Sequence, residues 1–227
     1  MWNYFGAKTR VVRLYPPPLP GLPVIEPFCG AAAYSLYHDW PDVLLNDISP
    51  AVVGAWHYLQ AVTPERMGEV FNEDRWPAGS NLRAAGLSQA ERDLMRWQSQ
   101  FGAVAPSHAH RSKWATSRRR LDALRRKWHR YRQTITGWTV TRGTYAEMPD
   151  IRATWFVDPP YQYARCKYPY DCVTDYGRLA EWCRSRKGRV IVCGGLGDGW
   201  LPFERLGVTR ACNGMNYPEF VWWQDND

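Results

Sequence analysis

The segment TWFVDPPYQYARCKY, from Thr154 to Tyr168, decides how the rest of the sequence is interpreted. Residues 155–157 are apolar and either aromatic or β-branched, which is typical of a short buried strand. Two prolines then end the strand, because proline cannot donate a backbone hydrogen bond and its φ is fixed. Asp158 is therefore expected at the carboxyl end of a strand, with Tyr161 just beyond it. Ligands bind at this edge in open α/β sheets; the alternative is a structural strand followed by a proline turn.

The composition is that of a globular protein. The chain has 227 residues, 45% of them hydrophobic and 13 of them tryptophan, which suits one α/β domain carrying an insertion, or two small domains. No apolar run approaches the length of a membrane span, and MWNYFGAKTR at the start has no apolar signal-peptide core. The six cysteines form no CxxC pair and no histidine cluster lies near them. We therefore expect reduced thiols, no metal site and a cytoplasmic location.

The positive charge of the chain is concentrated in one segment. The net charge is +7, and residues 111–132 contain ten lysines or arginines against a single acid, Asp122. This segment alone carries +9, so the rest of the chain carries −2. A local basic excess of this kind is typical of a nucleic-acid contact, although it also occurs on solvated helix faces.

The first third of the chain alternates strands and helices. A strand over Leu22–Ile25 is followed by a turn at 27–30 and an alanine-rich helix. A second strand, Val43–Leu45, ends at Asn46-Asp47, and a helix begins near Ser49-Pro50, where serine as N-cap and proline in the first turn favour a helix start. This alternation predicts the opening of a doubly wound nucleotide-binding α/β sheet with helices on both faces.

The alternation stops near Thr63, and from there to Gly137 the sequence is charged and helical without a convincing strand. Its clearest helix, 112–135, has one mostly apolar seam, formed by Trp114, Ser117, Leu121, Leu124, Trp128, Tyr131 and Ile135. Strands are expected again at 138–141 and 154–157, then a helix 174–188 with Thr174 as N-cap, a strand Arg189–Gly195 and a closing hairpin whose last strand is Phe220–Trp223.

Four features fall on one carboxyl edge of this predicted sheet: Glu26 with its turn, Asp47, the GTYAEM segment (143–148) and Asp158. A glycine-containing turn lets a ligand approach the backbone amides at a helix N-terminus. An acid at the end of the second strand is placed to accept from ribose hydroxyls. Since the chain has neither a G-x-G-x-x-G motif nor a lysine-bearing P-loop, the expected ligand is an adenosine compound and not a dinucleotide.

Four motifs resemble those of Dam-type DNA adenine N6-methyltransferases and occur in the same order: YFGAK (4–8), IEPFCGAAA (25–33), LNDISP (45–50) and DPPY (158–161). Two later stretches, IVCGGLGDGWLPF and PEFVWW, resemble the small stand-alone adenine methylases of bacteriophages. The resemblance covers most of the chain outside the insertion. It implies an α/β fold with a Rossmann-like class I methyltransferase sheet formed by residues 1–62 and 138–227, and a mainly helical, basic DNA-recognition insertion at 63–137.

The resemblance also implies S-adenosyl-L-methionine as cofactor and a set of residues that bind it. Asp47 matches the acid that holds the ribose. Ala32 departs from the family pattern, since many relatives have a second glycine there, and Tyr145 lies where relatives often have an aromatic residue followed by an acid. The cofactor-binding residues implied are Tyr4, Lys8, Glu26, Phe28, Gly30, Asp47, Ile48, Tyr145 and Asp158.

The catalytic residues implied are Asp158, Pro159, Pro160 and Tyr161. An adenine amine is a poor nucleophile because its lone pair is delocalised into the ring. The carboxylate of Asp158 and the carbonyl of Pro159 would accept its two hydrogens, so that the lone pair points at the methyl group; such positioning supplies most of the catalysis. Tyr161 would stack on a base flipped out of the duplex, and no metal is needed.

The implied partner is double-stranded DNA, in a bacterial or phage-infected cell, where the enzyme would act in restriction-modification or protect phage DNA from restriction. The candidates for contacts with its phosphates are Arg111, Lys113, Arg118, Arg119, Arg125 and Arg126.

Other functions fit parts of the sequence. Cytosine C5 methylation needs a Pro-Cys nucleophile, and the chain has no such dipeptide. Cytosine N4 enzymes usually read S-P-P-Y, and RNA or protein-glutamine methylases more often N-P-P-Y, so Asp158 favours adenine. The remaining alternative is a DNA-binding protein with an inactive methylase fold, against which Lys8, Asp47 and Asp158 argue.

Overall fold

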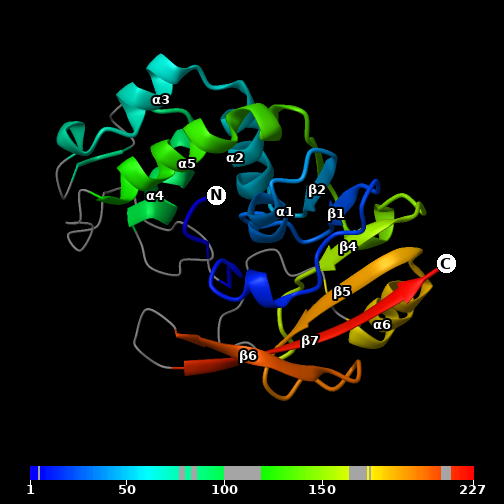
Figure 1. The fold of residues 1–227 in the computed structure, drawn as a ribbon. Coiled ribbons are helices and arrows are strands. Elements are labelled where there is room, and N and C mark those ends of the chain that lie inside the picture. The colour runs from blue at the N-terminus through cyan, green and yellow to red at the C-terminus, as the bar shows by residue number, and fades with distance from the viewer. Residues whose placement is uncertain are drawn as a thin grey trace.

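The computed structural model describes residues 1–4, 6–76, 80–82, 86–99, 119–163, 173, 175–210 and 216–227. In these residues one seven-stranded sheet is flanked by helices (Figure 1). The strands are β1 (Val24–Glu26), β2 (Val43–Asp47), β3 (Thr139–Arg142), β4 (Ala153–Val157), β5 (Gly188–Gly194), β6 (Glu204–Arg210) and β7 (Asn216–Asn226). The α-helices are α1 (Ala33–His38), α2 (Pro50–Ala61), α3 (Pro64–Val70), α4 (Gln89–Ser99), α5 (Arg119–Thr136) and α6 (Tyr176–Ser185), and the 3-10 turns are η1 (Val12–Leu14), η2 (Glu73–Arg75) and η3 (Tyr145–Glu147).

The sheet has the order β3-β2-β1-β4-β5-β7-β6. The first five of these are parallel, with Ile25 of β1 opposite Leu44 of β2 on one side and opposite Trp155 of β4 on the other. β7 pairs antiparallel with β5, and β6 antiparallel with β7. The strand order reverses between β1 and β4, and in open α/β sheets the crevice at such a point is the usual ligand site. The predicted mixed α/β sheet is confirmed.

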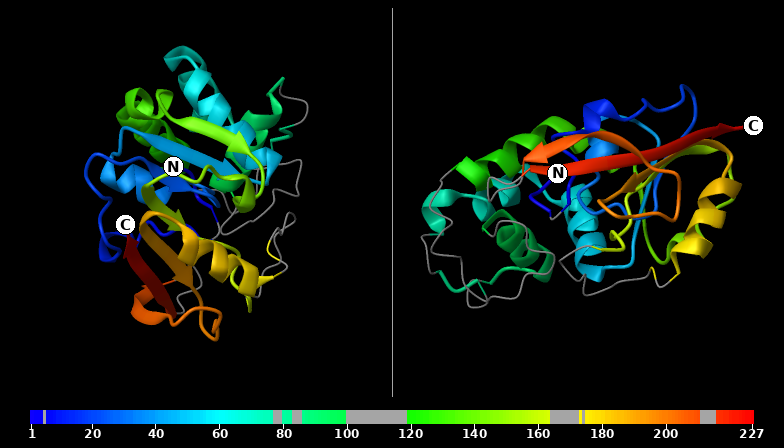
Figure 2. Two further views of the ribbon diagram at one scale, coloured as in Figure 1. Left: turned by 90° about the vertical axis from the view of Figure 1, so that its right-hand side faces the viewer. Right: turned by 90° about the horizontal axis from the view of Figure 1, so that it is seen from below.

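Two cores cover the two faces of the sheet because successive strand residues point to opposite sides. Phe156 of β4 belongs to the core under α1 and α2, whereas its neighbours Trp155 and Val157 belong to the core under α6. All five residues of β4 are buried, as is typical of a parallel strand covered on both faces. Figure 2 shows α6 on the side of the sheet away from helices α3 to α5.

The helical segment between α2 and β3 packs on α2 and extends the first core. The predicted seam of α5 is confirmed within the described residues, where Leu121, Leu124, Trp128 and Ile135 are buried and Tyr131 is half-buried. Trp114 and Ser117 lie outside the described residues. The buried residues of α4 and α5 join the same cluster as Trp56 of α2, so this segment shares the core of the sheet.

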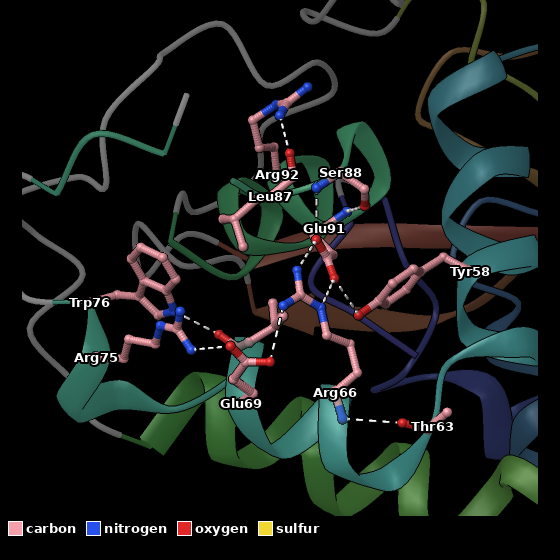
Figure 3. Close-up of polar contacts among 11 residues, drawn as sticks. Tyr58, Thr63, Arg66, Glu69, Arg75, Trp76, Leu87, Ser88, Glu91 and Arg92 are labelled. Carbon is pink, nitrogen blue, oxygen red and sulfur yellow. Dashed lines mark hydrogen bonds and ion pairs between the residues drawn. The ribbon is translucent and has the colours of Figure 1, made fainter. Parts of the chain in front are cut away.

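A buried carboxylate joins α2, α3 and α4 (Figure 3). Glu91 accepts from Nε and Nη2 of Arg66 at 2.7 and 2.9 Å, and from the hydroxyl of Tyr58 at 3.0 Å. The backbone amide of Ser88 donates to the same carboxylate at 2.7 Å. A two-point arginine–carboxylate pair fixes orientation as well as distance. Through this pair Arg66 of α3 holds α3 and α4 together.

Several predicted boundaries differ from the structure. β1 spans Val24–Glu26 and not Leu22–Ile25, and the last strand is the longer β7. Helix α6 ends at Ser185, and Gly188, which was predicted to end it, begins β5. Helix α6 has Asp175 as its N-cap, whose carboxylate accepts from the backbone amide of Arg178 at 3.0 Å; the predicted cap, Thr174, lies outside the described residues. Aspartate caps a helix at least as well as threonine, so Asp175, the residue after Thr174, was an equally good candidate for the N-cap of this helix.

The turn between β1 and α1 is strained at one position. Ala32, the residue before α1, has a φ of 46° and a ψ of 55°, which is the left-handed region. A residue other than glycine costs about 1–2 kcal/mol in this conformation. The resemblance described above implies glycine at this same position, and the backbone angle supplies the physical reason.

We predict that Ala32→Gly relieves this strain. The free energy of unfolding should stay unchanged or rise by up to about 1 kcal/mol, because the gain in backbone geometry offsets the added entropy of the unfolded chain. Ala31→Gly is the matched control: Ala31 lies outside the left-handed region, so it should lose about 0.5–1 kcal/mol. Urea unfolding of both variants measures the difference, and equal losses would contradict the assigned strain.

Candidate active site at the carboxyl edge of the sheet

The end of β2 holds two turns of the carboxyl edge together through Asn46. This buried side chain donates to the carbonyl of Pro27 at 3.1 Å and to the carbonyl of Gly143 at 2.9 Å. Its own oxygen accepts from the hydroxyl of Thr141 at 3.0 Å. The turn after β1 and the turn after β3 are therefore fixed relative to each other. This role of Asn46 was not predicted from the sequence.

Asp47 holds the glycine turn. One carboxylate oxygen accepts from the amide of Gly30 at 3.0 Å and the other from the amide of Ser49 at 2.9 Å. Burial raises the pKa of Asp47 to about 6, against the opposing effect of these two amide bonds. Each carboxylate oxygen has a second lone pair, so Asp47 can still accept from a ligand. The neighbouring Ile48 is half-buried, and its carbonyl accepts from Arg142 at 3.4 Å.

Tyr4 packs directly on this turn. A Cβ added to Gly30 would lie 3.0 Å from Cδ1 of Tyr4, and Gly30 has a φ of 44°. Only glycine combines that approach with that backbone angle without strain. Tyr4 also meets Trp97 of α4 edge-on, with ring centroids 5.7 Å apart. The residues predicted around the glycine turn, Tyr4, Gly30 and Asp47, are thus brought together.

Phe28 and Tyr145 form an aromatic pair beside the same turn. Their ring centroids are 5.7 Å apart, and Tyr145 is 8% exposed because it also packs edge-on against Trp182 of α6. A third ring between them would need about 7 Å, twice the contact distance of about 3.5 Å. An adenine ring would therefore lie on the exposed side of Phe28 and not between the two rings.

Glu26 lies beneath helix α1 and is 2% exposed. One of its oxygens accepts from the backbone amide and the hydroxyl of Ser35, at 2.9 and 2.6 Å. Because Ala32 has no side chain that could cap α1, Glu26 caps the helix from the neighbouring strand. Burial raises the pKa of Glu26 to about 7, with the Ser35 hydrogen bonds opposing the shift. The structure accounts for Glu26 as a helix cap, and its contact with a cofactor stays a prediction.

A buried ion pair lies at the carboxyl end of β4. The ammonium of Lys8 is 2.8 Å from Asp158, with the two side chains 4% and 21% exposed. It also donates to the carbonyl of Gly6 at 2.9 Å and lies 4.9 Å from the ring centre of Tyr161. Burial raises the pKa of Asp158 and the charge of Lys8 opposes this. Burial alone would lower the pKa of Lys8, but the groups around it, Asp158 first and Glu219 second, together outweigh burial and raise that pKa.

Contacts on several sides fix the D-P-P-Y segment. The carbonyl of Pro160 accepts from the hydroxyl of Tyr176 at 2.7 Å. The hydroxyl of Tyr161 donates to Glu219 of β7 at 2.9 Å. A Cβ added to Gly195, after β5, would lie only 2.5 Å from Cδ2 of Tyr161, so the ring rests against bare backbone there. Pro159 is buried, and the predicted catalytic residues all lie at this one edge.

Besides Asn46, two side chains of this site were not predicted from the sequence, Glu219 and Cys193. Glu219 is 9% exposed, and Cys193 of β5 is buried with its thiol hydrogen-bonded to Asp158. Burial raises the pKa of the Cys193 thiol, as does the nearby Asp158. A signal for Glu219 was present, since an acid in the otherwise apolar PEFVWW strand needs a partner when it is buried.

The DNA-contact candidates are only partly described. Arg111, Lys113 and Arg118 lie outside the described residues, and Arg119 starts α5 without a described side chain. Arg125 pairs with Asp122 at 3.0 Å on the surface of α5, where such pairs contribute about 1 kcal/mol or less. Arg126 is exposed. Both lie off the buried seam, as expected.

Among the described residues, no group of three or more histidine, cysteine, aspartate or glutamate side chains is arranged to hold a metal ion. None of the described helices combines the length and the apolar character that crossing a membrane requires.

Comparison of the chain with models of known protein families finds no match, and comparison with curated proteins finds none either.

We predict that Glu26→Gln changes the pH dependence of stability. The folded state holds the Glu26 proton with a pKa of about 7, against an ordinary value of 4.5. The contribution of Glu26 to the free energy of unfolding is therefore fully present below pH 4.5 and is lost as the pH rises through 7. Glutamine keeps an acceptor for Ser35 and carries no charge.

The stability of Glu26→Gln relative to wild type should thus increase by about 3 kcal/mol between pH 4.5 and pH 8, because 2.5 pH units correspond to roughly that much. Urea unfolding at several pH values measures it. Glu181→Gln on the exposed face of α6 is the control and should run parallel to wild type. A Glu26→Gln curve that also runs parallel would show that Glu26 does not titrate in this way.

Proposed function

We propose that this protein is a DNA methyltransferase that transfers the methyl group of S-adenosyl-L-methionine to the N6 amine of an adenine flipped out of the duplex. The observation that carries the proposal is the position of Asp158. It lies at the carboxyl end of β4, beside the reversal of strand order, and is paired with the buried Lys8. The glycine turn and Asp47 lie at the ends of β1 and β2, on the same edge.

The sheet supports this proposal over a dinucleotide-binding enzyme. The order of its parallel strands is that of a doubly wound nucleotide-binding sheet, but the antiparallel β7 is inserted between β5 and β6. An edge hairpin of this kind is the arrangement expected of the class I methyltransferase sheet. The glycine turn likewise has a single left-handed glycine, Gly30, in place of a dinucleotide fingerprint.

The residues around the glycine turn fit an adenosine-containing cofactor in their chemistry. Asp47 keeps free lone pairs for ribose hydroxyls, and Phe28, which is half-buried beside Tyr145, offers a ring edge and face. Gly30, Ile48 and Tyr4 would line the same site, with Lys8 and Asp158 at its far end. When bound, S-adenosyl-L-methionine supplies an electrophilic methyl group.

The chemistry of Asp158 follows from its pairing. Lys8 favours the ionised form of Asp158 against the effect of burial on its pKa, and the carboxylate can accept a hydrogen bond from an aromatic amine. The carbonyl of Pro159 is the second acceptor we propose, held by two prolines whose φ angles are fixed. With both hydrogens engaged, the nitrogen lone pair leaves the plane of the ring. The contribution of these residues is orientation without reorganisation during the reaction.

Tyr161 borders the space where the base would lie. Its ring is fixed by Lys8, Gly195 and Glu219, so it can offer a preformed surface for stacking. Stacking of a base on an aromatic ring contributes about 1–3 kcal/mol. The exposed Arg126 and its neighbours on α5 would neutralise phosphates of the duplex.

The test is to identify the methylated nucleoside. We predict that the protein, incubated with labelled S-adenosyl-L-methionine and duplex DNA of mixed sequence, produces N6-methyladenine on enzymatic digestion and mass spectrometry. Asp158→Ala should lower the rate by roughly a hundredfold or more, since losing one preorganised hydrogen-bond partner of the reacting group costs about 3 kcal/mol. Its affinity for DNA should persist.

Other outcomes separate the alternatives. N4-methylcytosine as product would assign the cytosine reaction, and labelled RNA with unlabelled DNA would assign an RNA methylase. DNA binding without transfer of the labelled methyl group would indicate a DNA-binding protein with an inactive methylase fold. Equal rates in Asp158→Ala and wild type would refute the role of Asp158.

A further inference from the structure

Glu219 is a carboxylate that the chemistry proposed above does not use. It lies near the start of β7, one residue from Phe220, which pairs with Gly194 at the end of β5. Its partner across the hairpin is Gly207 of β6. The hairpin formed by β6 and β7 thereby places Glu219 near the end of β5, beside the carboxyl end of β4. With 9% exposure, this carboxylate is almost fully removed from water.

Glu219 acts on two residues of the site. Its Oε2 accepts from the hydroxyl of Tyr161 at 2.9 Å. Its charge, after that of Asp158, contributes to raising the pKa of Lys8. Glu219 and Lys8 meet at the same ring, because the hydroxyl of Tyr161 bonds to Glu219 and the ammonium of Lys8 lies 4.9 Å from its ring centre. Lys8 thus forms an ion pair with Asp158 and lies in the field of a second carboxylate, that of Glu219.

The presence of a second carboxylate near the ammonium of Lys8 affects the ability of Asp158 to accept further hydrogen bonds. A buried cation must be compensated, and an acid that does so alone is held more closely to that cation than one that shares the compensation. When Glu219 shares the compensation, the lone pairs of Asp158 that face away from Lys8 stay available to another donor. Lys8, Asp158 and Glu219 together carry a charge of −1, which also favours a positively charged ligand.

Glu219 also fixes the ring of Tyr161. The ring has Lys8 at 4.9 Å from its centre, and a Cβ on Gly195 would overlap it. These contacts restrict the ring plane, and the hydrogen bond to Glu219 fixes the direction of its hydroxyl end. A hydrogen bond to a charged acceptor is stronger than one between neutral groups.

From these contacts we infer that Glu219 is a positioning residue for the reaction at Asp158, which it serves by sharing the charge of Lys8 and anchoring Tyr161. This inference rests on the proposed function. The competing view is that Glu219 only satisfies the Tyr161 hydroxyl and contributes to stability.

Two substitutions separate the two effects of Glu219. Glu219→Gln removes its charge and keeps an acceptor for Tyr161, whereas Tyr161→Phe removes the hydrogen bond and keeps the charge. Glu204→Gln is the matched control, because Glu204 is an exposed glutamate of the same hairpin. All variants are assayed as full chains with labelled S-adenosyl-L-methionine and duplex DNA, and their melting temperatures are measured alongside.

Glu219→Gln should lower kcat by roughly tenfold to a hundredfold with little change in the KM for DNA, because the geometry of the amine acceptor is disturbed. The acid limb of the kcat/KM profile should also shift to lower pH, since the charge of Glu219 raises the pKa of Asp158. The charged or titratable groups around Asp158 include Lys8 and Tyr15 of the N-terminal segment, Glu26 of β1, Tyr161, Cys193 of β5 and Glu219 of β7.

Tyr161→Phe should mainly raise the KM for DNA, and Glu204→Gln should match wild type. A merely structural Glu219 would lower the melting temperature of Glu219→Gln and leave kcat and the pH profile unchanged, which would overturn the inference. If wild type itself transfers no methyl group, the proposed function fails and the inference falls with it. An active wild type beside an equally active Glu219→Gln overturns the inference alone.

Discussion

Lys8 and Asp158 form the contact on which the rest of the site depends. A lysine that is 4% exposed needs compensation, and the carboxylate 2.8 Å away supplies it. The same pairing favours the ionised form of Asp158 and opposes burial, which raises its pKa. Because Lys8 comes from the N-terminal segment and Asp158 from the end of β4, this ion pair joins the start of the chain to the centre of the sheet. Glu219 of β7 and Tyr161 then pack around the pair.

The N-terminal segment also connects the helical segment to the glycine turn. Trp2 stacks on Trp97 of α4 with ring centroids 5.3 Å apart, and it packs against Trp56 of α2 at 5.1 Å. Two residues later, Tyr4 covers Gly30. The helices proposed to contact DNA and the turn proposed to hold the cofactor are thus in contact through the same few aromatic side chains. A change in the packing of α4 would displace the turn at Gly30, because closely packed interiors transmit strain.

Much of the fold could be predicted from the sequence, because strands such as 154–157 and the seam of α5 have simple apolar patterns. The edge location of Asp47 and Asp158 followed from where those strands end. Asn46, Cys193 and Glu219 were missed because their roles depend on neighbours distant in sequence: Glu219 bonds to Tyr161 across 58 residues. Glu26 was placed at the turn but caps α1, since the left-handed Ala32 leaves that helix without a cap of its own. Such pairings arise from the topology of the sheet and have no local pattern.

A double-mutant cycle on the ion pair tests the central claim most directly. Lys8→Met leaves Asp158 without its cation, and Asp158→Asn leaves Lys8 with the charge of Glu219 alone, so each should lower the free energy of unfolding by about 3 kcal/mol at neutral pH. The double variant removes both charges and should lose about as much as either single variant, which gives a coupling energy of at least about 2 kcal/mol. Losses that add to within about 0.5 kcal/mol would show that the two side chains do not depend on each other, and would contradict the role given to Lys8.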